Sequence, residues 1–331
     1  MREPFGILPS GEQAWLYTIQ NANLQAQLAD FGATLVRLYA SDSSGKADDV
    51  VLGFKDCNAY RTSPTYCGAI VGRNANRIRD SRFDLNGTTV QLEANEGANC
   101  NHSGPNCYAF RLWQVESISE SSITFYLLSP DGDQGFPGNA EIRVTYTLSG
   151  NALSVQFDAV SDKDTVFNMT NHSFFNLAGH QHPELAVQQI LTLPSQVYTE
   201  ADSNNIPTGR LLSVGGTPMD FREGKPICQD IDLCPGGYDL NFVVASNPAA
   251  ILHDPTSGRT MTVSTDMPGI HFYSGNYLAG EIGKDDISYC RRGGMALETQ
   301  YYPDAVHHPE WEQPFVKAGE HWHAETTFSF Q

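Results

Sequence analysis

The sequence predicts an all-β protein built as one large β-sandwich. Apolar and polar residues alternate along most of the 331 residues, which is the pattern of half-buried strands. No segment carries a sustained apolar stripe at helical spacing, and 29 glycines and 18 prolines spread along the chain predict many turns. Because no linker, charge block or repeat divides the chain, we expect residues 1–331 to form a single domain.

Three segments show the strand pattern most clearly. Residues 82–92 are expected to form a hairpin, since the Asn86-Gly87 pair at their centre is the strongest short signal for one. Residues 141–157 predict a second hairpin, in which the apolar alternation resumes after a turn around Gly150. The chain ends in an expected strand over residues 322–330, where every second side chain lies on one face.

The composition excludes several classes of partner. A formal net charge of -18 argues against nucleic acid, because binding to phosphates needs a surplus of lysine and arginine, and equally against an anionic membrane surface. No apolar run reaches the length of a signal peptide or a membrane span. Seven cysteines without a CxxC pair predict reduced thiols. We therefore expect a cytoplasmic protein, and the sequence leaves its oligomeric state open between a monomer and a homodimer.

Five polar clusters interrupt the strand pattern. They are GAIVGRNANRI (68–78), NHSG (101–104), TNHSFFNLAG (170–179), GGYDLNF (236–242) and ALETQYYPD (296–304). Each cluster alone has a structural explanation, such as a surface position for Arg77 or a turn role for Asp239. Taken together, they supply the hydrogen-bond donors, acceptors and aromatic faces that a sugar requires, so we predict a sugar pocket.

Other kinds of site are less well supported. No Gly-Lys-Ser/Thr follows the glycines of residues 68–78, so they do not form a phosphate loop. The pairs His180-x-His182 and His321-x-His323 each suggest two imidazoles on one strand face, but no third ligand has a motif-like spacing, and we expect no metal. Asp239 and Glu298 could also be read as the two carboxylates that flank the scissile bond in a glycoside hydrolase. An assay for hydrolysis of aryl glycosides would test this alternative.

The motifs GRNANRI, TNHSFFNLAG, GGYDLNF and ALETQYYPD together resemble the aldose 1-epimerases, the galactose mutarotase family. The similarity runs nearly end to end and includes DFGAT (30–34), DVVLGF (49–54) and TPMDFR (217–222). It implies a large twisted antiparallel β-sandwich, the galactose mutarotase-like supersandwich, with a sugar bound in an open cleft across one sheet. It also implies catalysis without metal or organic cofactor on a monosaccharide substrate, a free aldohexose such as D-galactose or D-glucose.

The resemblance assigns a role to each candidate site residue. Glu298 is expected to be the general base and His172 the general acid, with Asn171 and Ser173 holding the histidine. Glutamate is ordinarily ionised at neutral pH, and we expect neighbouring anions to raise the pKa of His172 so that it carries a proton. Five residues are expected to bind the sugar, namely Arg77, His102, Asp239, Asn76 and His271.

Three positions depart from the family pattern. NHSG at residues 101–104 stands where the family commonly has Leu-His-Gly-Gly, Leu240 replaces a frequent histidine, and His271 stands where a glutamine usually contacts the sugar. Since the expected catalytic pair is intact, these departures concern substrate preference more than chemistry.

Two alternatives on the same fold remain open at this point. A non-catalytic sugar-binding or sensor protein would keep Arg77 and Asp239 but lose Glu298 or His172. A hexose-phosphate mutarotase would need extra arginines near the pocket, and only Arg73, Arg77 and Arg79 cluster in the sequence.

Overall fold

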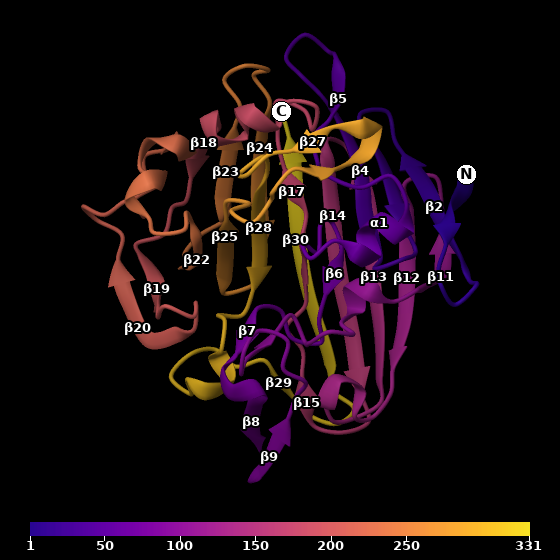
Figure 1. Ribbon diagram of the computed structural model, residues 1–331, viewed down its shortest axis with the longest axis vertical. Coiled ribbons are helices and arrows are strands. Elements are labelled where there is room, and N and C mark those ends of the chain that lie inside the picture. Colours follow the sequence, from indigo (N-terminus) through magenta and orange to yellow (C-terminus); the bar gives the residue numbers. More distant parts are fainter.

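The computed structural model describes residues 1–331 and consists mainly of antiparallel strands, which confirms the predicted fold class (Figure 1). Its largest sheet has nine strands in the order β11-β12-β13-β14-β30-β24-β23-β18-β21. These strands are β11 (Gln114–Ile118), β12 (Ser122–Ser129), β13 (Ala140–Ser149), β14 (Ala152–Ser161), β30 (His321–Phe330), β24 (Thr260–Thr265), β23 (Ala250–His253), β18 (Ile190–Thr192) and β21 (Lys225–Pro226).

Two smaller sheets lie against the nine-stranded sheet. One has six strands in the order β17 (Phe174–Phe175), β28 (Met295–Gln300), β25 (Gly269–Tyr273), β22 (Asp239–Val243), β19 (Val197–Ala201) and β20 (Pro207–Ser213). The other has five strands in sequence order, β1 (Arg2–Ile7), β2 (Gln13–Gln20), β3 (Gln25–Ala29), β4 (Thr34–Ser41) and β5 (Ala47–Asp49). A β-bridge between Val51 and Phe175 joins the end of the five-stranded sheet to β17.

The main core fills the space between the nine-stranded sheet and the two smaller ones. A cluster of 55 buried residues draws on all three sheets, for example through Ile19 on β2, Val144 on β13 and Phe272 on β25. Strand alternation decides which side chains enter it, since successive residues of a strand point to opposite faces. On β28, Leu297 packs into this core, whereas its neighbour Glu298 points to the other face of the six-stranded sheet.

The strands predicted most clearly from the sequence are all present. β8 (Arg82–Leu85) and β9 (Thr88–Gln91) form the expected hairpin, with Asn86 and Gly87 at φ 53° and 76°, the left-handed values that a type I′ turn needs. β13 and β14 pair from end to end around a turn at Gly150. The terminal strand β30 pairs with β14 on one side and β24 on the other, in the middle of the largest sheet.

Helices are short and few. The single α-helix is α1 (Cys57–Thr62), which begins where the Asp56 carboxylate accepts a hydrogen bond from the Ala59 N–H. The 3₁₀ turns are η1 (Arg79–Ser81), η2 (Tyr108–Phe110), η3 (Asp133–Gly135), η4 (Pro183–Gln188), η5 (Ile227–Gln229), η6 (Ile231–Leu233), η7 (Lys284–Asp286) and η8 (Ala305–His307). None of the helices combines the length and apolar character needed to cross a bilayer.

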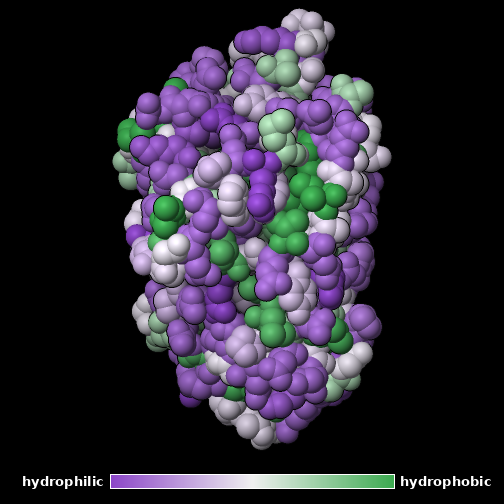
Figure 2. Space-filling model, turned by 90° about the vertical axis from the view of Figure 1, so that its right-hand side faces the viewer, coloured by the Kyte–Doolittle hydropathy of each residue, from purple (hydrophilic) through white to green (hydrophobic).

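Short strand pairs hold the loops that cover the six-stranded sheet and the ends of the molecule. They are β6 (Ile70–Val71) with β16 (Thr170–Asn171), β7 (Arg77–Ile78) with β10 (Cys100–Asn101), β15 (Thr165–Val166) with β29 (Phe315–Val316), and β26 (Glu281–Ile282) with β27 (Ser288–Tyr289). The side of the molecule that carries β2, β11 and β12 presents a mostly polar surface with separate hydrophobic groups (Figure 2).

Candidate active site

A cavity of about 360 Å³ opens on the face of the six-stranded sheet that points away from the main core. This volume lies within the range of small-molecule sites. The residues that line it are Pro64, Thr65, Tyr66, Asn76, Arg77, Glu96, Asn101, His102, His172, Phe174, Asp239, His271, Tyr273, Tyr277, Leu278 and Glu298. The structure thus brings together all seven residues that the sequence analysis selected.

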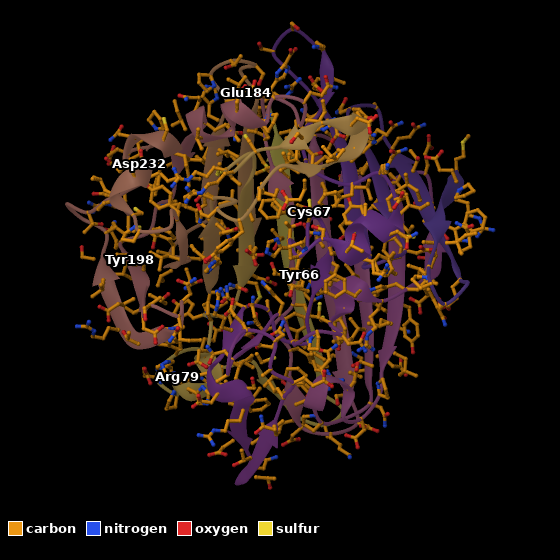
Figure 3. All side chains as sticks on the ribbon, in the orientation of Figure 1. Tyr66, Cys67, Arg79, Glu184, Tyr198 and Asp232 are labelled. Atoms are coloured by element: carbon orange, nitrogen blue, oxygen red, sulfur yellow. The ribbon has the colours of Figure 1, made fainter.

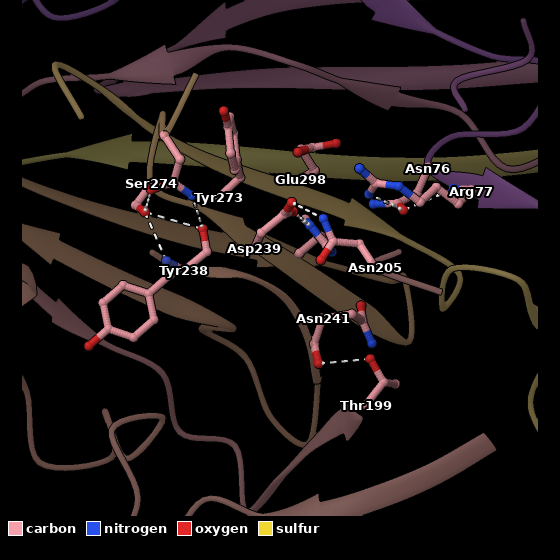
Figure 4. Close-up of polar contacts among 12 residues, drawn as sticks. Asn76, Arg77, Thr199, Asn205, Tyr238, Asp239, Asn241, Tyr273, Ser274 and Glu298 are labelled. Carbon is pink, nitrogen blue, oxygen red and sulfur yellow. Dashed lines mark hydrogen bonds and ion pairs between the residues drawn. The ribbon is translucent and has the colours of Figure 1, made fainter. Parts of the chain in front are cut away.

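The sheet supplies three of these side chains from neighbouring strands. Glu298 lies in β28, whose six residues are all buried, and His271 pairs with it on β25. Asp239 begins β22 and pairs with Tyr273, which lies two residues beyond His271. Paired residues on adjacent strands share one face of a sheet, so these side chains point into the same cavity. Figure 4 shows Glu298, Asp239 and Tyr273 on this face.

His172 enters from the loop between β16 and β17. Its carbonyl accepts a hydrogen bond from the Gly68 N–H at 2.8 Å. The Asn171 side chain donates to the Gly68 carbonyl at 2.9 Å and to the Tyr146 hydroxyl at 3.1 Å. Asn171 therefore fixes the backbone of this loop, as expected, whereas the buried Ser173 hydroxyl makes no hydrogen bond within the protein and does not hold the histidine.

The imidazole of His172 is held by aromatic packing. Its ring centroid lies 5.2 Å from that of Phe174, 5.3 Å from that of His102 and 6.0 Å from that of Tyr66. Figure 3 shows Tyr66 near the centre of the molecule in this view. Phe174 follows His172 by two residues in TNHSFF, so strand alternation predicts that the two share a side. The sequence around Tyr66 carries no comparable signal.

Asn76 fixes the protonation of His102. The Asn76 backbone has φ 59° and directs its N–H to Nδ1 of His102 at 3.1 Å. Because Nδ1 accepts this hydrogen bond, the neutral imidazole carries its proton on Nε2. Burial, together with the charges of His172, Arg77 and His271, holds the pKa of His102 well below its usual value. His102 thus remains a neutral hydrogen-bond donor over the neutral pH range.

Arg77 is held by a residue that the sequence analysis missed. Its Nε and Nη2 donate to the two carboxylate oxygens of Glu96, at 2.5 and 2.9 Å. Glu96 also lines the cavity, and it lies in a tight turn in which it pairs with Asn99. Nothing in the local sequence distinguishes Glu96 from an ordinary surface glutamate, because its partner is 19 residues away.

Asp239 has two polar neighbours. Nε2 of His271 lies 2.7 Å from one carboxylate oxygen, and the Asn205 side chain donates to the other at 3.1 Å. Burial alone would raise the pKa of Asp239, but the hydrogen bond and charge of His271, with the charge of Arg77, hold it below its usual value. Asp239 is therefore an ionised acceptor at neutral pH. Leu240, which follows it, points toward the main core and away from the cavity.

The pKa values of Glu298 and His172 lie in the opposite order to the one expected from the sequence. Burial raises the pKa of Glu298 to about 7, whereas burial lowers the pKa of His172 to about 4. The expectation failed because removal from water disfavours both charged forms more strongly than nearby charges favour them. His172 Nε2 lies 3.5 Å from Glu298 Oε1, and neither His172 Nδ1 nor Glu298 Oε2 has a partner in the protein. Between about pH 4 and 7 the pair holds one proton, mainly on Glu298.

The geometry of His102, His172 and Glu298 raises the question of a metal, because their ligand atoms lie within 4.8 Å of one another. The proton on Nε2 of His102 makes that nitrogen a donor rather than a ligand, so this set does not suit an ion.

The sequence prediction that His180 and His182 lie on one face of a strand is wrong, because neither residue is in a strand. His180 lies in a turn, where it is buried against Tyr289 and Asp285, and His182 directly precedes η4.

Comparisons with known proteins show the family of the chain. A family model described as aldose 1-epimerase matches residues 16–329. The galactose mutarotase of Homo sapiens is 37% identical, over 99% of this chain and 98% of its own, and the aldose 1-epimerase of Haemophilus influenzae is 38% identical, over 98% and 97%. An aldose epimerase homologue from C. elegans superposes with a TM-score of 0.90 at 29% identity, covering 96% of this chain and 99% of its own. These matches over nearly the whole length show that the chain belongs to the aldose 1-epimerase family.

Proposed function

We propose that the protein is an aldose 1-epimerase, an isomerase that interconverts the α and β anomers of free aldohexoses such as D-galactose and D-glucose. The observation that carries the proposal is the buried pair of Glu298 and His172, whose facing atoms are 3.5 Å apart in a cavity lined with polar and aromatic groups. Such a pair can take a proton at one point of a ligand and give one at another.

The sugar is held by the remaining polar groups of the cavity. Arg77 and the Nε2–H of His102 donate to hydroxyls, and the ionised Asp239 accepts from them. The rings of Tyr66 and Tyr273 offer apolar faces to the C–H groups of a pyranose. Asn76 and His271 complete the set of proposed sugar contacts.

Mutarotation opens the hemiacetal, turns the C1 aldehyde over and closes the ring again. In the opening step, Glu298 as carboxylate takes the O1 proton while His172 as imidazolium gives its proton to the ring oxygen, and the C1–O5 bond breaks. The open-chain aldehyde then faces a protonated Glu298 and a neutral His172. In closure, Glu298 returns its proton to the carbonyl oxygen as His172 removes the proton from the C5 hydroxyl.

The number of protons held by Glu298 and His172 supports this cycle. The pair carries one proton before ring opening and one after it, because His172 gives its proton to the ring oxygen while Glu298 takes a different proton from O1. The two pKa values favour the form with the proton on Glu298, which is the form that faces the open-chain aldehyde in this cycle. Each positioned proton transfer contributes roughly 10²–10⁴-fold to the rate.

A hexose-phosphate mutarotase would need arginines in the cavity to bind the phosphate, and two of the three candidates, Arg73 and Arg79, lie outside it. Arg73 is fully buried away from the cavity, where its guanidinium donates to Ser129 and to the Pro137 carbonyl. Arg79 donates to the Pro207 carbonyl and does not line the cavity. A non-catalytic sugar-binding protein would have no use for a buried carboxyl beside a buried imidazole, which costs stability.

We further propose that residues 1–331 act as one domain, which the shared core cluster supports. The substrate is a small monosaccharide rather than nucleic acid or a membrane surface, and the acidic net charge supports that choice. As expected from the sequence, we also propose that the protein is cytoplasmic and acts as a monomer or a homodimer.

Polarimetry of freshly dissolved α-D-galactose and α-D-glucose tests the proposal. The purified protein, kept with a strong chelator, should speed the change in optical rotation of both sugars, because no proposed step uses a metal. Methyl α-D-galactoside, which lacks a free O1 proton, should show no change and serves as the control. An unaltered rate with every free aldohexose would overturn the proposal, and slow hydrolysis of the methyl glycoside would point to a glycosidase.

A further inference from the structure

Within the protein, the Glu96 carboxylate pairs with the Arg77 guanidinium and neutralises its positive charge. The carboxylate faces the guanidinium with both oxygens, an arrangement that is stronger than a single hydrogen bond. The Arg77 side chain is only 9% exposed, whereas that of Glu96 is 42% exposed. Glu96 is therefore the more exposed partner of the pair, and both residues also border the neighbouring surface depression that contains Asn204 and Asn205.

Arg77 is the one permanently charged cation among the residues that line the cavity, since no lysine and no second arginine are present there. The carboxylates on the same lining are Glu96, Asp239 and Glu298. Of the three histidines, His102 and His172 have lowered pKa values through burial and are neutral near pH 7. An anionic ligand would therefore enter a cavity whose only fixed positive charge is already neutralised.

We propose that Glu96 is a specificity-determining residue that reserves the site for uncharged sugars by neutralising Arg77. This inference rests on the proposed mutarotase function and extends it to the class of sugar that is accepted. A sugar with a carboxylate or phosphate gains no ion pair with Arg77 unless it displaces Glu96, and it must approach the Glu96 charge to do so. A neutral aldohexose needs only the hydrogen bonds that Arg77 still has free.

The Glu96→Gln variant separates charge from shape. Glutamine keeps an oxygen that can accept from Arg77, but it removes the negative charge and leaves the guanidinium charge available to a ligand. Glu96→Ala removes the same charge with a different loss of packing, so both variants should change selectivity in the same direction. Glu93→Gln is the matched control, because Glu93 is exposed on the same loop and does not line the cavity.

The experiment compares kcat/KM for D-galacturonate and D-galactose, which differ by a charge at C6. The wild-type protein should strongly favour galactose, and Glu96→Gln should raise the galacturonate-to-galactose ratio by about tenfold or more, the scale of one partly exposed charge contact. Raising the salt from about 0.01 M to about 1 M shortens the Debye length from about 30 Å to about 3 Å and should shrink this gain. The methyl ester of galacturonic acid has the same bulk without charge and should not gain.

Three results would overturn the inference. They are a wild-type protein that turns over galacturonate as well as galactose, an unchanged ratio in folded Glu96→Gln and Glu96→Ala, and an equal gain for the methyl ester. A ratio that rises as much in Glu93→Gln would also contradict it. A wild-type protein that does not accelerate galactose mutarotation at all would instead refute the proposed function, so the two failures are distinguishable.

Discussion

Raising the pH should remove the single proton that Glu298 and His172 share in the free protein, and kcat/KM should fall with it. The proposed cycle needs one proton on the pair. Because burial raises the pKa of Glu298 to about 7, the pair loses this proton above that pH. Because burial lowers the pKa of His172 to about 4, the pair gains a second proton below that pH and then has no base.

These two values set the size of the effect. The one-proton form prevails between about pH 4 and 7, and about one tenth of the protein retains it one pH unit above the upper value. At about pH 9 only roughly one hundredth remains, so kcat/KM for galactose should be about a hundredfold below its maximum. The sugar itself does not titrate over this range, so the profile reports the free protein.

The assay is polarimetry across this pH range, with the uncatalysed rate subtracted at each pH. Tyr66→Ala tests the cause of the shifts, because the Tyr66 ring lines the cavity and packs against the rings of His102 and His172. Water entering the opened cavity should lower the pKa of Glu298 and raise that of His172, so both limbs of the profile should move inward. A kcat/KM that stays level or rises up to pH 9 would refute the reasoning, and limbs that do not move in Tyr66→Ala would refute burial as the cause.

Two further variants probe the same site. Glu298→Gln should be more stable than wild type by roughly 3 kcal/mol above about pH 7, and the two should be equally stable below about pH 4. The folded wild-type protein binds the Glu298 proton more tightly than the unfolded chain does. The wild type therefore loses stability as the pH rises from about 4.5 to about 7, whereas glutamine has no proton to lose. Denaturant unfolding at several pH values measures this difference, and an advantage that is independent of pH would contradict it. His271→Gln, which can still donate to Asp239, should shift the ratio of kcat/KM between galactose and glucose while the better substrate stays within roughly tenfold, since one hydrogen bond contributes about 0.5–1.5 kcal/mol. A ratio unchanged across several aldoses would mean that His271 does not contact the sugar.

Much of the fold and most of the site residues could be predicted from the sequence, because those features depend on local patterns. The left-handed turn at Asn86-Gly87 and the alternation in β30 follow from neighbouring residues alone. The same alternation could have placed Leu240 on the face opposite Asp239, and Tyr273 on the same face as His271.

The features that could not be predicted depend on tertiary contacts. The pKa values of Glu298 and His172 are set by burial, which arises only when loops from distant parts of the chain cover β28. The sequence motif suggested Arg77 as a free sugar ligand, whereas the folded chain pairs it with Glu96. Arg73 looked like a member of the same group, but the fold buries its guanidinium against Ser129 and Thr165.

The most direct test of the account is the turnover of Glu298→Gln and His172→Asn, measured beside their affinity for galactose. Glutamine keeps the shape of the carboxyl group but cannot take the O1 proton, and asparagine cannot deliver a proton to the ring oxygen. Each variant should fold and lose about two to four orders of magnitude in kcat. Galactose binding by calorimetry should weaken far less, because Arg77 and Asp239 still hold the hydroxyls. The double variant should be little worse than the poorer single one, whereas a folded single variant with near wild-type kcat would contradict the assignment of that residue.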